Sequence, residues 1–433
     1  MTQIGYAQKD ITPYANAFGS YRLSGVKRHS GIHDPLFAHV LAIRDDRRAC
    51  LLVSLDVVAV PSERADETKA VLARISDIDP AAILIAATHI HNGPETLNEE
   101  NDPRIRVWDD MQQVVTEAAK EALRHLTHTR VFWARRDLPI ATNRYQHRLG
   151  QTENTTDPQL DVLIFEAPTG KHLGVLYHYA AHPTCAMAVE QRVSGDYSGL
   201  ADRIIEQRTD GFSMFFNGAC GNINLEVGNR SFERAQKRAD EMAGGVIGVL
   251  AGQRVRIEAS LAWANRVVQV GIKRDMGNLD IPPDLEEQKA VLERMRASEW
   301  KAVITDPKRQ QDAFQRYQVY RQALWRVLLR KRYADRPTEA LPLQCLRIGP
   351  VILVAVPGEL FIEHQLRLQA RFPERRVMIF GYANGFCGYI PTAEAMAAPM
   401  YETQASLMHR LDGRAGDLMM AAAAEMIRSE LGN

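Results

Sequence analysis

The sequence predicts an α/β fold, in which a mixed central sheet is flanked by helices within a single large domain. Short apolar runs alternate with amphipathic stretches, which is typical of strands that alternate with helices. Several of these runs, such as residues 50–60, are dense enough in apolar side chains to be buried on both faces of a sheet. No repeat, low-complexity tract or Gly/Ser-rich linker divides the 433 residues.

The elements follow one another along the chain. Apolar runs predict strands at 38–43, 50–60, 81–87, 131–133, 161–165, 173–180, 212–216, 343–348, 351–356 and 376–380. Helical periodicity predicts helices at 62–75, 107–125, 198–207, 231–250, 360–369 and 413–431. The last helix is rich in Ala and Met, which indicates packing in the core.

A helical insertion is predicted at about residues 283–335. The segment is rich in Glu, Lys, Arg and Gln, and its spacing indicates two amphipathic helices that are broken near Asp306-Pro307. A solvated helical layer is the plainer interpretation, because charged stretches usually face solvent. A lid or a contact between copies of the chain is the alternative, so a homo-oligomer stays open. With this insertion, residues 1–433 are expected to form one domain.

The composition excludes several classes of partner. Lys and Arg total 53 and Asp and Glu total 53, and this neutral balance argues against nucleic acid as the main partner. No stretch approaches the ~20 apolar residues of a membrane helix, and the start lacks a basic segment followed by an apolar run. The five cysteines are odd in number and form no CxxC pair, which indicates free thiols. We therefore expect a cytoplasmic protein that acts on a small molecule.

Two histidines follow the predicted strand at 81–87. His89 and His91 are two residues apart, so in an extended chain both side chains point the same way. They can share one metal ion, or one can bind metal while the other faces a substrate. The structural alternative is that both histidines only form hydrogen bonds beside the Gly93-Pro94 turn. The spacing of His89 and His91 does not decide between a metal site and this structural role.

A third histidine, His182, is presented at the end of the strand at 173–180, where Pro183 stops a helix from continuing. His178 lies inside that strand and is interpreted as structural. Asp196 follows in a loop, where its carboxylate can lie against a histidine. Asp196 can equally be the N-terminal cap of the helix that follows.

The strand at 212–216 runs into a Gly-rich turn that contains Asn222 and Asn224. Such a turn exposes backbone N–H groups and can serve as an oxyanion or anion site. Cys220 in this turn is interpreted as a buried, inert thiol. Elsewhere, Asn143-Arg144 offers either a binding group for a substrate carboxylate or one half of a structural salt bridge.

Glu359 follows the strand at 351–356 and a Pro-Gly turn, where it is a plausible metal carboxylate. A place in the first turn of the helix at 360–369 is the alternative, since the helix dipole favours an acid there. Two histidines and one glutamate at three strand ends suit a catalytic Zn²⁺ ion, which usually takes three protein ligands and keeps one position open. The cysteines show no ligand spacing, so nitrogen and oxygen ligands are favoured.

Motifs spread over nearly the whole chain resemble the catalytic domain of the neutral/alkaline non-lysosomal ceramidase family. In order, they are DITP at 10–13, HDPL at 33–36, SLD at 54–56, THIHNGP at 88–94, AHP at 181–183, SGD at 194–196, GNIN at 221–224, VPGE at 356–359, GYIPT at 388–392 and YE at 401–402. The resemblance implies a catalytic zinc held by two histidines, a glutamate and a tyrosine. Carried over by motif, these ligands are His89, His182, Glu359 and Tyr389, and His91 falls where the family contacts substrate.

Two departures from the family pattern bear on the substrate. The family's catalytic serine is replaced by Asn224, which can still donate a hydrogen bond to an oxyanion. The family's C-terminal β-sandwich is not in this chain, and both departures make ceramide itself a doubtful substrate.

The resemblance implies a zinc-dependent amidohydrolase that cleaves the N-acyl bond of a small or amphiphilic linear amide. His91 is the first candidate for the proton donor, and Asp196 is expected to orient a neighbouring histidine. An esterase or lactonase that uses the same chemistry is one alternative, and a non-catalytic, metal-stabilised binding protein is another.

Overall fold

The computed structural model describes residues 2–12, 31–94, 96–97, 107–187, 192–225, 227–228, 230–273, 329, 332–333, 335–398, 400–403 and 409–432. The predicted helical insertion at about 283–335 lies outside the described residues, apart from residues 329, 332–333 and 335. In the described ranges, no helix is long and apolar enough to cross a membrane.

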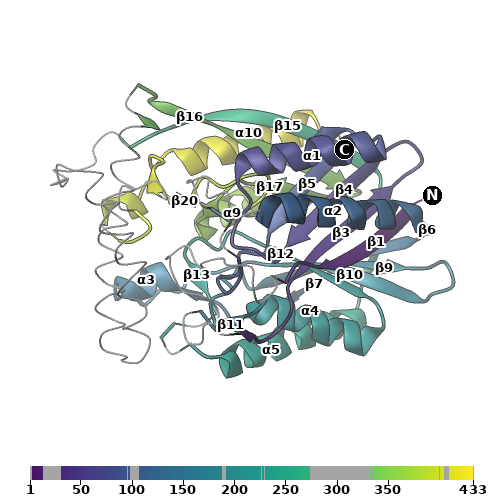
Figure 1. The fold of residues 1–433 in the computed structure, drawn as a ribbon. Coiled ribbons are helices and arrows are strands. Elements are labelled where there is room, and N and C mark those ends of the chain that lie inside the picture. The colour runs from purple at the N-terminus through teal and green to yellow at the C-terminus, as the bar shows by residue number, and fades with distance from the viewer. Residues whose placement is uncertain are drawn as a thin grey trace.

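The first sheet has the strand order β5-β4-β3-β1-β6 and is covered on its outer face by two helices (Figure 1). Its strands are β1 (Gln3–Asp10), β3 (Phe37–Arg44), β4 (Ala49–Leu55), β5 (Ile83–Ala87) and β6 (Thr127–His128). The covering helices are α1 (Ser62–Ser76) and α2 (Val107–Arg124). Only the β4–β5 pair is parallel in this sheet.

The second sheet has the order β12-β10-β9-β7-β14, and two further helices cover it on the far side of the molecule. Its strands are β7 (Arg130–Asp137), β9 (Gln159–Glu166), β10 (His172–Tyr179), β12 (Phe212–Asn217) and β14 (Val255–Ile257). Its helices are α4 (Asp196–Thr209) and α5 (Phe232–Leu250). The two sheets pack against each other, and the Ser54 hydroxyl donates to the Phe215 carbonyl oxygen across the interface at 2.7 Å.

The third sheet has the order β15-β16-β17-β19 and carries the C-terminal helices. Its elements are β15 (Leu261–Gly271), β16 (Thr338–Ile348), β17 (Val351–Ala355), β19 (Arg376–Phe380), α9 (Ile362–Ala370) and α10 (Ala415–Ser429). Short elements complete the described fold: β2 (Gly31–Ile32), β8 (Thr142–Asn143), β11 (Arg192–Val193), β13 (Ile223–Asn224), β18 (Glu359–Leu360), β20 (Tyr389–Ile390), α3 (Arg144–Arg148), and the 3-10 turns η1 (Pro80–Ala82) and η3 (Ala395–Ala397).

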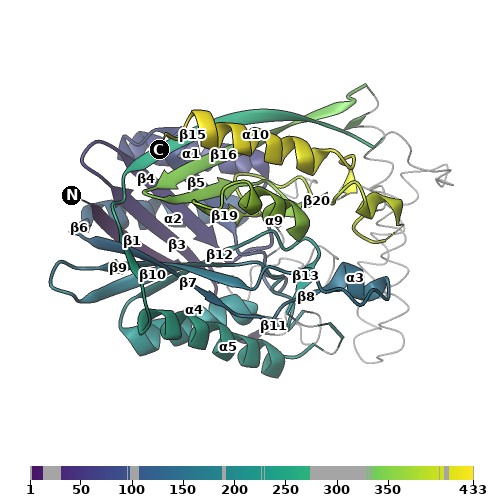
Figure 2. The same ribbon diagram turned by 180° about the vertical axis from the view of Figure 1, so that it is seen from behind.

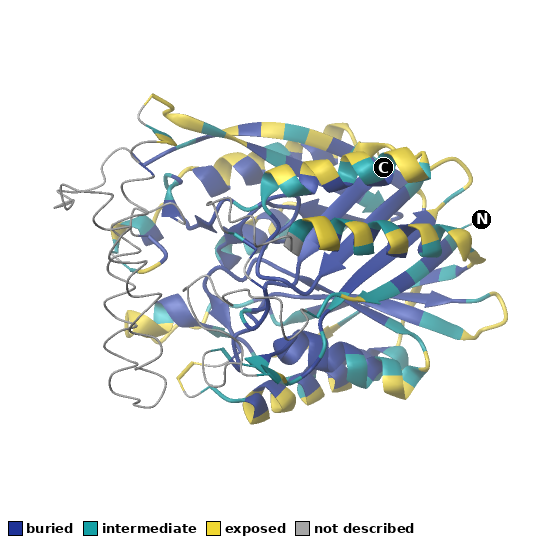
Figure 3. Cartoon of the chain, viewed as in Figure 1, coloured by how far each residue is buried: buried dark blue, intermediate teal, exposed yellow. Residues whose placement is uncertain are grey.

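The predicted α/β class is confirmed, with mixed sheets inside and helices outside (Figure 3). The strands are divided among several sheets, whereas the sequence pattern suggested one central sheet. The predicted strand at 50–60 ends at Leu55, because Asp56 turns its buried carboxylate back to accept the Phe37 N–H at 2.9 Å. In the three main sheets, strands β1, β6, β14 and β15 were not predicted.

Each of the three main sheets ends in one parallel pair at its edge: β4–β5, β10–β12 and β17–β19. The carboxyl ends of these pairs meet. The Asn217 side chain donates to the Thr88 carbonyl at 3.1 Å, and the Gly381 N–H donates to the Asn217 carbonyl at 3.0 Å. Both chain ends lie on the opposite side of the molecule (Figures 1 and 2). Because loops that follow parallel strands form most sites in α/β proteins, this meeting point is where a site is expected.

Candidate active site

His89 follows β5 directly and is fully buried. Its backbone has a φ of +70°, a left-handed conformation that costs a non-glycine residue about 1–3 kcal/mol. The surrounding contacts hold this geometry: the imidazole Nδ1 lies 2.5 Å from the Val58 carbonyl oxygen, and the ring stacks on Tyr382 with centroids 3.8 Å apart. Strain at a buried polar residue of this kind is typical of functional sites.

His182 follows β10 and presents its imidazole to that of His89. Its Nδ1 lies 2.5 Å from the Cys220 carbonyl oxygen, and the two Nε2 atoms are 3.2 Å apart. A carbonyl oxygen only accepts, so each Nδ1 carries a proton, and an imidazole that is neutral in this tautomer presents its lone pair at Nε2. Burial lowers the pKa of His182 to about 3, with Arg144 adding to the effect, so this ring is neutral near pH 7. Two facing lone pairs cannot bond to each other and call for a cation between them.

Glu359 supplies the negative charge at this point. Its Oε2 lies 3.0 Å from His182 Nε2 and 3.5 Å from His89 Nε2, and the side chain is buried. Burial raises the pKa of this carboxyl, but the contacts with His89 and His182 outweigh burial and hold the pKa well below its ordinary value. Its second oxygen, Oε1, has no hydrogen-bond partner among the described residues. Glu359 lies in β18, so the alternative that places it in the following helix is wrong; α9 begins at Ile362.

His91 lies on the more open side of the pair. Its Nε2 is 3.3 Å from His89 Nε2, its ring meets that of His89 edge to face, and the residue is half-buried. One nitrogen from each of the three histidines lies within 4.8 Å of the others, so His89, His91 and His182 are a second possible set of metal ligands. Burial lowers the pKa of His91, and the neighbouring His89, His182 and Arg230 lower it further, whereas Glu359 opposes them.

Tyr389 is brought beside Glu359 by the parallel pairing of β18 with β20. Its hydroxyl accepts a hydrogen bond from Arg144 Nη2 at 3.0 Å. Burial raises the pKa of this phenol, Glu359 raises it further, and Arg144 opposes both. The structure thus brings His89, His182, Glu359 and Tyr389 to one place from four separate loops.

Arg144 ties these loops together. Its guanidinium donates to Glu402 Oε1 at 3.0 Å, to Asn224 Oδ1 at 2.9 Å and to the Gly221 carbonyl oxygen at 2.7 Å, in addition to Tyr389. Of the two roles that the sequence left open for Arg144, the structure therefore places it in a buried salt bridge with Glu402. Sequence reasoning missed its contact with Tyr389.

Asn224 and Asp196 occupy different surroundings. Asn224 is buried and lies beside His182 through a parallel bridge between their backbones. Asp196 is the first residue of α4, and its carboxylate accepts from the backbone N–H groups of Cys185, Ala186 and Tyr197. These bonds fix the loop that follows His182. The catalytic roles of both residues stay predictions.

Two residues that were interpreted as structural are buried and bonded in ways that fit this interpretation. His178 Nε2 lies 2.8 Å from the Ile379 carbonyl oxygen. Cys220 Sγ lies 3.0 Å from the Tyr382 hydroxyl, and burial raises the pKa of this thiol well above its ordinary value. A thiol held in its protonated form is a poor nucleophile.

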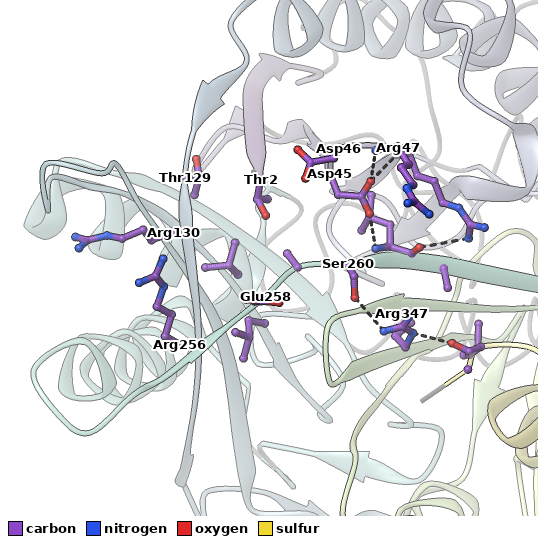
Figure 4. Close-up of a pocket in the computed structure, with 18 of the residues that line it drawn as sticks. Thr2, Asp45, Asp46, Arg47, Thr129, Arg130, Arg256, Glu258, Ser260 and Arg347 are labelled. Carbon is purple, nitrogen blue, oxygen red and sulfur yellow. Dashed lines mark hydrogen bonds between the residues drawn. The ribbon is translucent and has the colours of Figure 1, made fainter.

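A separate cavity of about 1250 Å³ lies near the two chain ends, and none of His89, His91 and His182 lines it (Figure 4). Its lining carries arginines and acids together, including Arg130, Arg256 and Arg347 with Asp45 and Glu258. None of the histidines or acids described above lines it, so it is not the centre to which the sequence pattern points.

The fold and site define an α/β protein with a buried histidine–carboxylate centre at the ends of parallel strands. The model of the neutral/alkaline non-lysosomal ceramidases, N-terminal, matches residues 2–225, more than half of the chain, and the chain therefore belongs to this family. The chain is 24% identical over 470 aligned residues to the neutral ceramidase of Pseudomonas aeruginosa, covering 94% of this chain and 69% of that protein.

Solved structures agree with this fold. A crystal structure of neutral ceramidase from Pseudomonas aeruginosa matches all of this chain and 75% of its own length, with a TM-score of 0.75 and 19% identity. A ceramidase complexed with C2 matches all of this chain and 76% of its own length, with a TM-score of 0.73 and 18% identity. Family membership supports an amide-bond hydrolase.

Proposed function

We propose that the chain is a zinc-dependent hydrolase that cleaves the amide bond of a small or amphiphilic N-acyl compound. The observation that carries the proposal is the convergence of two imidazole Nε2 atoms, 3.2 Å apart, on the buried carboxylate of Glu359. The second oxygen of that carboxylate has no hydrogen-bond partner in the described part of the chain. Buried imidazoles beside a buried carboxylate fit a divalent cation, and this donor set suits zinc.

His89, His182 and Glu359 would hold the ion, with Tyr389 as the fourth ligand on the neighbouring strand. When bound, zinc lowers the pKa of a water molecule to about 7 and polarises a carbonyl group. The backbone carbonyls of Val58 and Cys220 orient the two imidazoles, as the partners of metal-binding histidines usually do.

His91 is the proposed proton carrier. Cleavage of an amide needs a proton delivered to the leaving nitrogen, and histidine is the side chain most often used for such transfers. His91 stands 3.3 Å from His89 on the half-exposed side, so it can face a substrate while His89 faces inward. It would take a proton from the attacking water and return it to the amine.

Asn224 is the proposed donor to the oxyanion. Its Oδ1 accepts from Arg144, which fixes the amide so that Nδ2, the donor end, lies on the other side. Hydrogen bonds to a developing oxyanion are a large term in acyl-transfer catalysis. Asp196 would contribute by holding the loop after His182 in place.

An activity assay with the zinc-loaded protein tests the proposal. The substrates are a panel of N-acyl amides with chains of increasing length, each paired with its ester, and the variants are His91→Ala and, as a control outside the site, His125→Ala. We expect amide turnover in the wild type and in the control, and a loss of about 10²–10⁴ in kcat for His91→Ala with zinc still bound. Unchanged amide turnover in His91→Ala would exclude the proton carrier, and loss of zinc would place His91 among the ligands. Absence of amide turnover across the panel would contradict the proposed function.

A further inference from the structure

Asn217, the last residue of β12, lies buried where the ends of the parallel strand pairs meet. Its amide bonds to the main chain of two other loops. Nδ2 donates to the Thr88 carbonyl oxygen at 3.1 Å, and Oδ1 accepts from the Ala181 N–H at 3.3 Å. Thr88 directly precedes His89, and Ala181 directly precedes His182. One side chain therefore holds the residue next to each of the two histidines that face each other.

The bond to Thr88 fixes the peptide unit that leads into His89. The carbonyl oxygen of this unit accepts from Asn217, and its N–H donates to the Val57 carbonyl oxygen at 3.0 Å. Because a peptide unit is planar, bonds at both of its ends fix the plane from which the φ of His89 is measured. A left-handed φ of +70° persists only where the surroundings over-determine it. Asn217 supplies one of the contacts that hold His89 in this conformation.

The bond to Ala181 acts on the loop of the other histidine. The Ala181 carbonyl oxygen accepts from the Tyr197 hydroxyl at 2.7 Å, and the His182 N–H donates to the Ile223 carbonyl oxygen at 2.9 Å. Asn217 holds the remaining side of Ala181, its N–H group. Three successive backbone groups are thus bonded, and they set the direction in which the His182 side chain leaves the loop.

The orientation of the Asn217 amide follows from its partners. A carbonyl oxygen only accepts and an N–H only donates, so Nδ2 faces the His89 loop and Oδ1 faces the His182 loop. The backbone of Asn217 adds a third link, since its carbonyl oxygen accepts from the Gly381 N–H at 3.0 Å. Gly381 precedes Tyr382, the residue whose ring stacks on that of His89. Asn217 therefore joins every segment that fixes the position of the His89 ring to the loop of His182.

We propose that Asn217 is a positioning residue for the metal centre, and that its amide sets the approach of the two Nε2 atoms, which are 3.2 Å apart. This inference rests on the proposed function. Both ends of the amide are taken, so Asn217 acts through His89 and His182 and not as a ligand. Removal of a group that orients metal ligands typically costs about 10–100-fold in metal affinity or activity. The carbonyls of Val58 and Cys220 orient the two rings, whereas Asn217 places the backbone that carries them.

Zinc affinity, measured by competition with a chelator, tests the inference in Asn217→Ala and Asn217→Leu. Both variants lose the two hydrogen bonds, but Ala leaves space and Leu fills it, so an effect that they share comes from the bonds. We expect zinc to bind about 10–100-fold more weakly in both. The visible spectrum of the Co²⁺-loaded protein should change as well, because it reports the geometry of the ligands. At saturating zinc, kcat for an amide that the wild type cleaves should fall while KM stays nearly unchanged.

Gln344→Ala is the matched control. Gln344 is a buried amide in β16 that also joins two sheets, since its Nε2 donates to the carbonyl oxygens of Ala81 at 2.7 Å and Ile83 at 3.2 Å. These bonds lie at the start of β5, whereas His89 follows its end. The control should lower the free energy of unfolding and keep the zinc affinity and the Co²⁺ spectrum of the wild type.

The possible outcomes separate this inference from the proposed function. Weaker zinc binding with an altered Co²⁺ spectrum in the Asn217 variants alone supports the inference, even if the wild type cleaves no amide and the proposed function fails. Wild-type affinity and spectrum in both Asn217 variants overturn the inference, and amide turnover by the wild type then leaves the proposed function standing. An equal loss in Gln344→Ala also overturns it, as does failure of both Asn217 variants to fold, because the amide would then support the fold and not the site. A wild type that binds no zinc would overturn the inference together with the proposed metal centre.

Discussion

Replacing Arg144 by methionine is expected to destabilise the protein strongly, even without metal. The substitution removes four hydrogen bonds and leaves the carboxylate of Glu402, which is fully buried, with Arg148 alone. Breaking a buried ion pair by removing one partner costs about 3–5 kcal/mol. Arg148→Met is the matched control: it removes a guanidinium from the same oxygen, but Arg148 is 42% exposed, and such pairs contribute about 0–1 kcal/mol.

The measurement is the free energy of unfolding by denaturant, with a chelator present so that bound metal does not contribute. A double-mutant cycle with Glu402→Gln isolates the pair, and its coupling energy is expected to be about 1.5–3 kcal/mol. A loss below about 1 kcal/mol for Arg144→Met, or no measurable coupling, would refute the assignment of Arg144 as the group that ties the site loops together. Zinc affinity measured on the same variant should fall about 10–100-fold, because Tyr389 loses the donor that orients its hydroxyl.

Further predictions concern pH, backbone space and thiol chemistry. Burial lowers the pKa of His39 from 6.5 to about 4, so between these pH values the unfolded chain binds a proton that the folded chain does not. The free energy of unfolding should therefore fall by about 3 kcal/mol as the pH drops from 6.5 to 4. His39→Gln should flatten this part of the profile of Tm against pH. Gly221→Ala would press a Cβ against the Glu359 carbonyl and should lower zinc content, whereas Gly244→Ala has open space and should keep it. All five cysteines are buried, and burial raises the pKa of Cys220 above its ordinary value, so mass spectrometry after iodoacetamide at pH 8 should find no alkylation in the folded protein and five alkyl groups after unfolding.

Three of the four candidate ligands could be predicted because each comes within four residues of the end of an apolar strand. His89, His182 and Glu359 are the polar residues that the chain presents where β5, β10 and β17 end, and this pattern is local. Tyr389 lies in a strand of two residues, too short to leave a periodic signal, and only the resemblance to a family pointed to it.

Arg144 shows where the sequence carries no signal. The side-chain partners of Arg144 lie 80 to 258 residues away, so nothing near residue 144 reveals that it joins them.

The division into several sheets escaped prediction for a related reason. β1 and β15 mix polar and apolar residues, and β14 is only three residues long, so none resembles a buried apolar run. Strand pairing depends on contacts between distant segments, such as β1 with β6 and β14 with β7.

The most direct test of the metal centre is the zinc content of the purified protein, measured by elemental analysis in the wild type, His182→Ala and His178→Gln. His178 lies four residues before His182, in the strand that leads to it, and bonds to a backbone carbonyl, so its variant controls for the loss of a nearby buried histidine. We expect about one zinc per chain in the wild type and in His178→Gln, and almost none in His182→Ala. Stoichiometric zinc in His182→Ala, or no zinc in a wild-type protein prepared without chelator and reconstituted with the metal, would contradict the account.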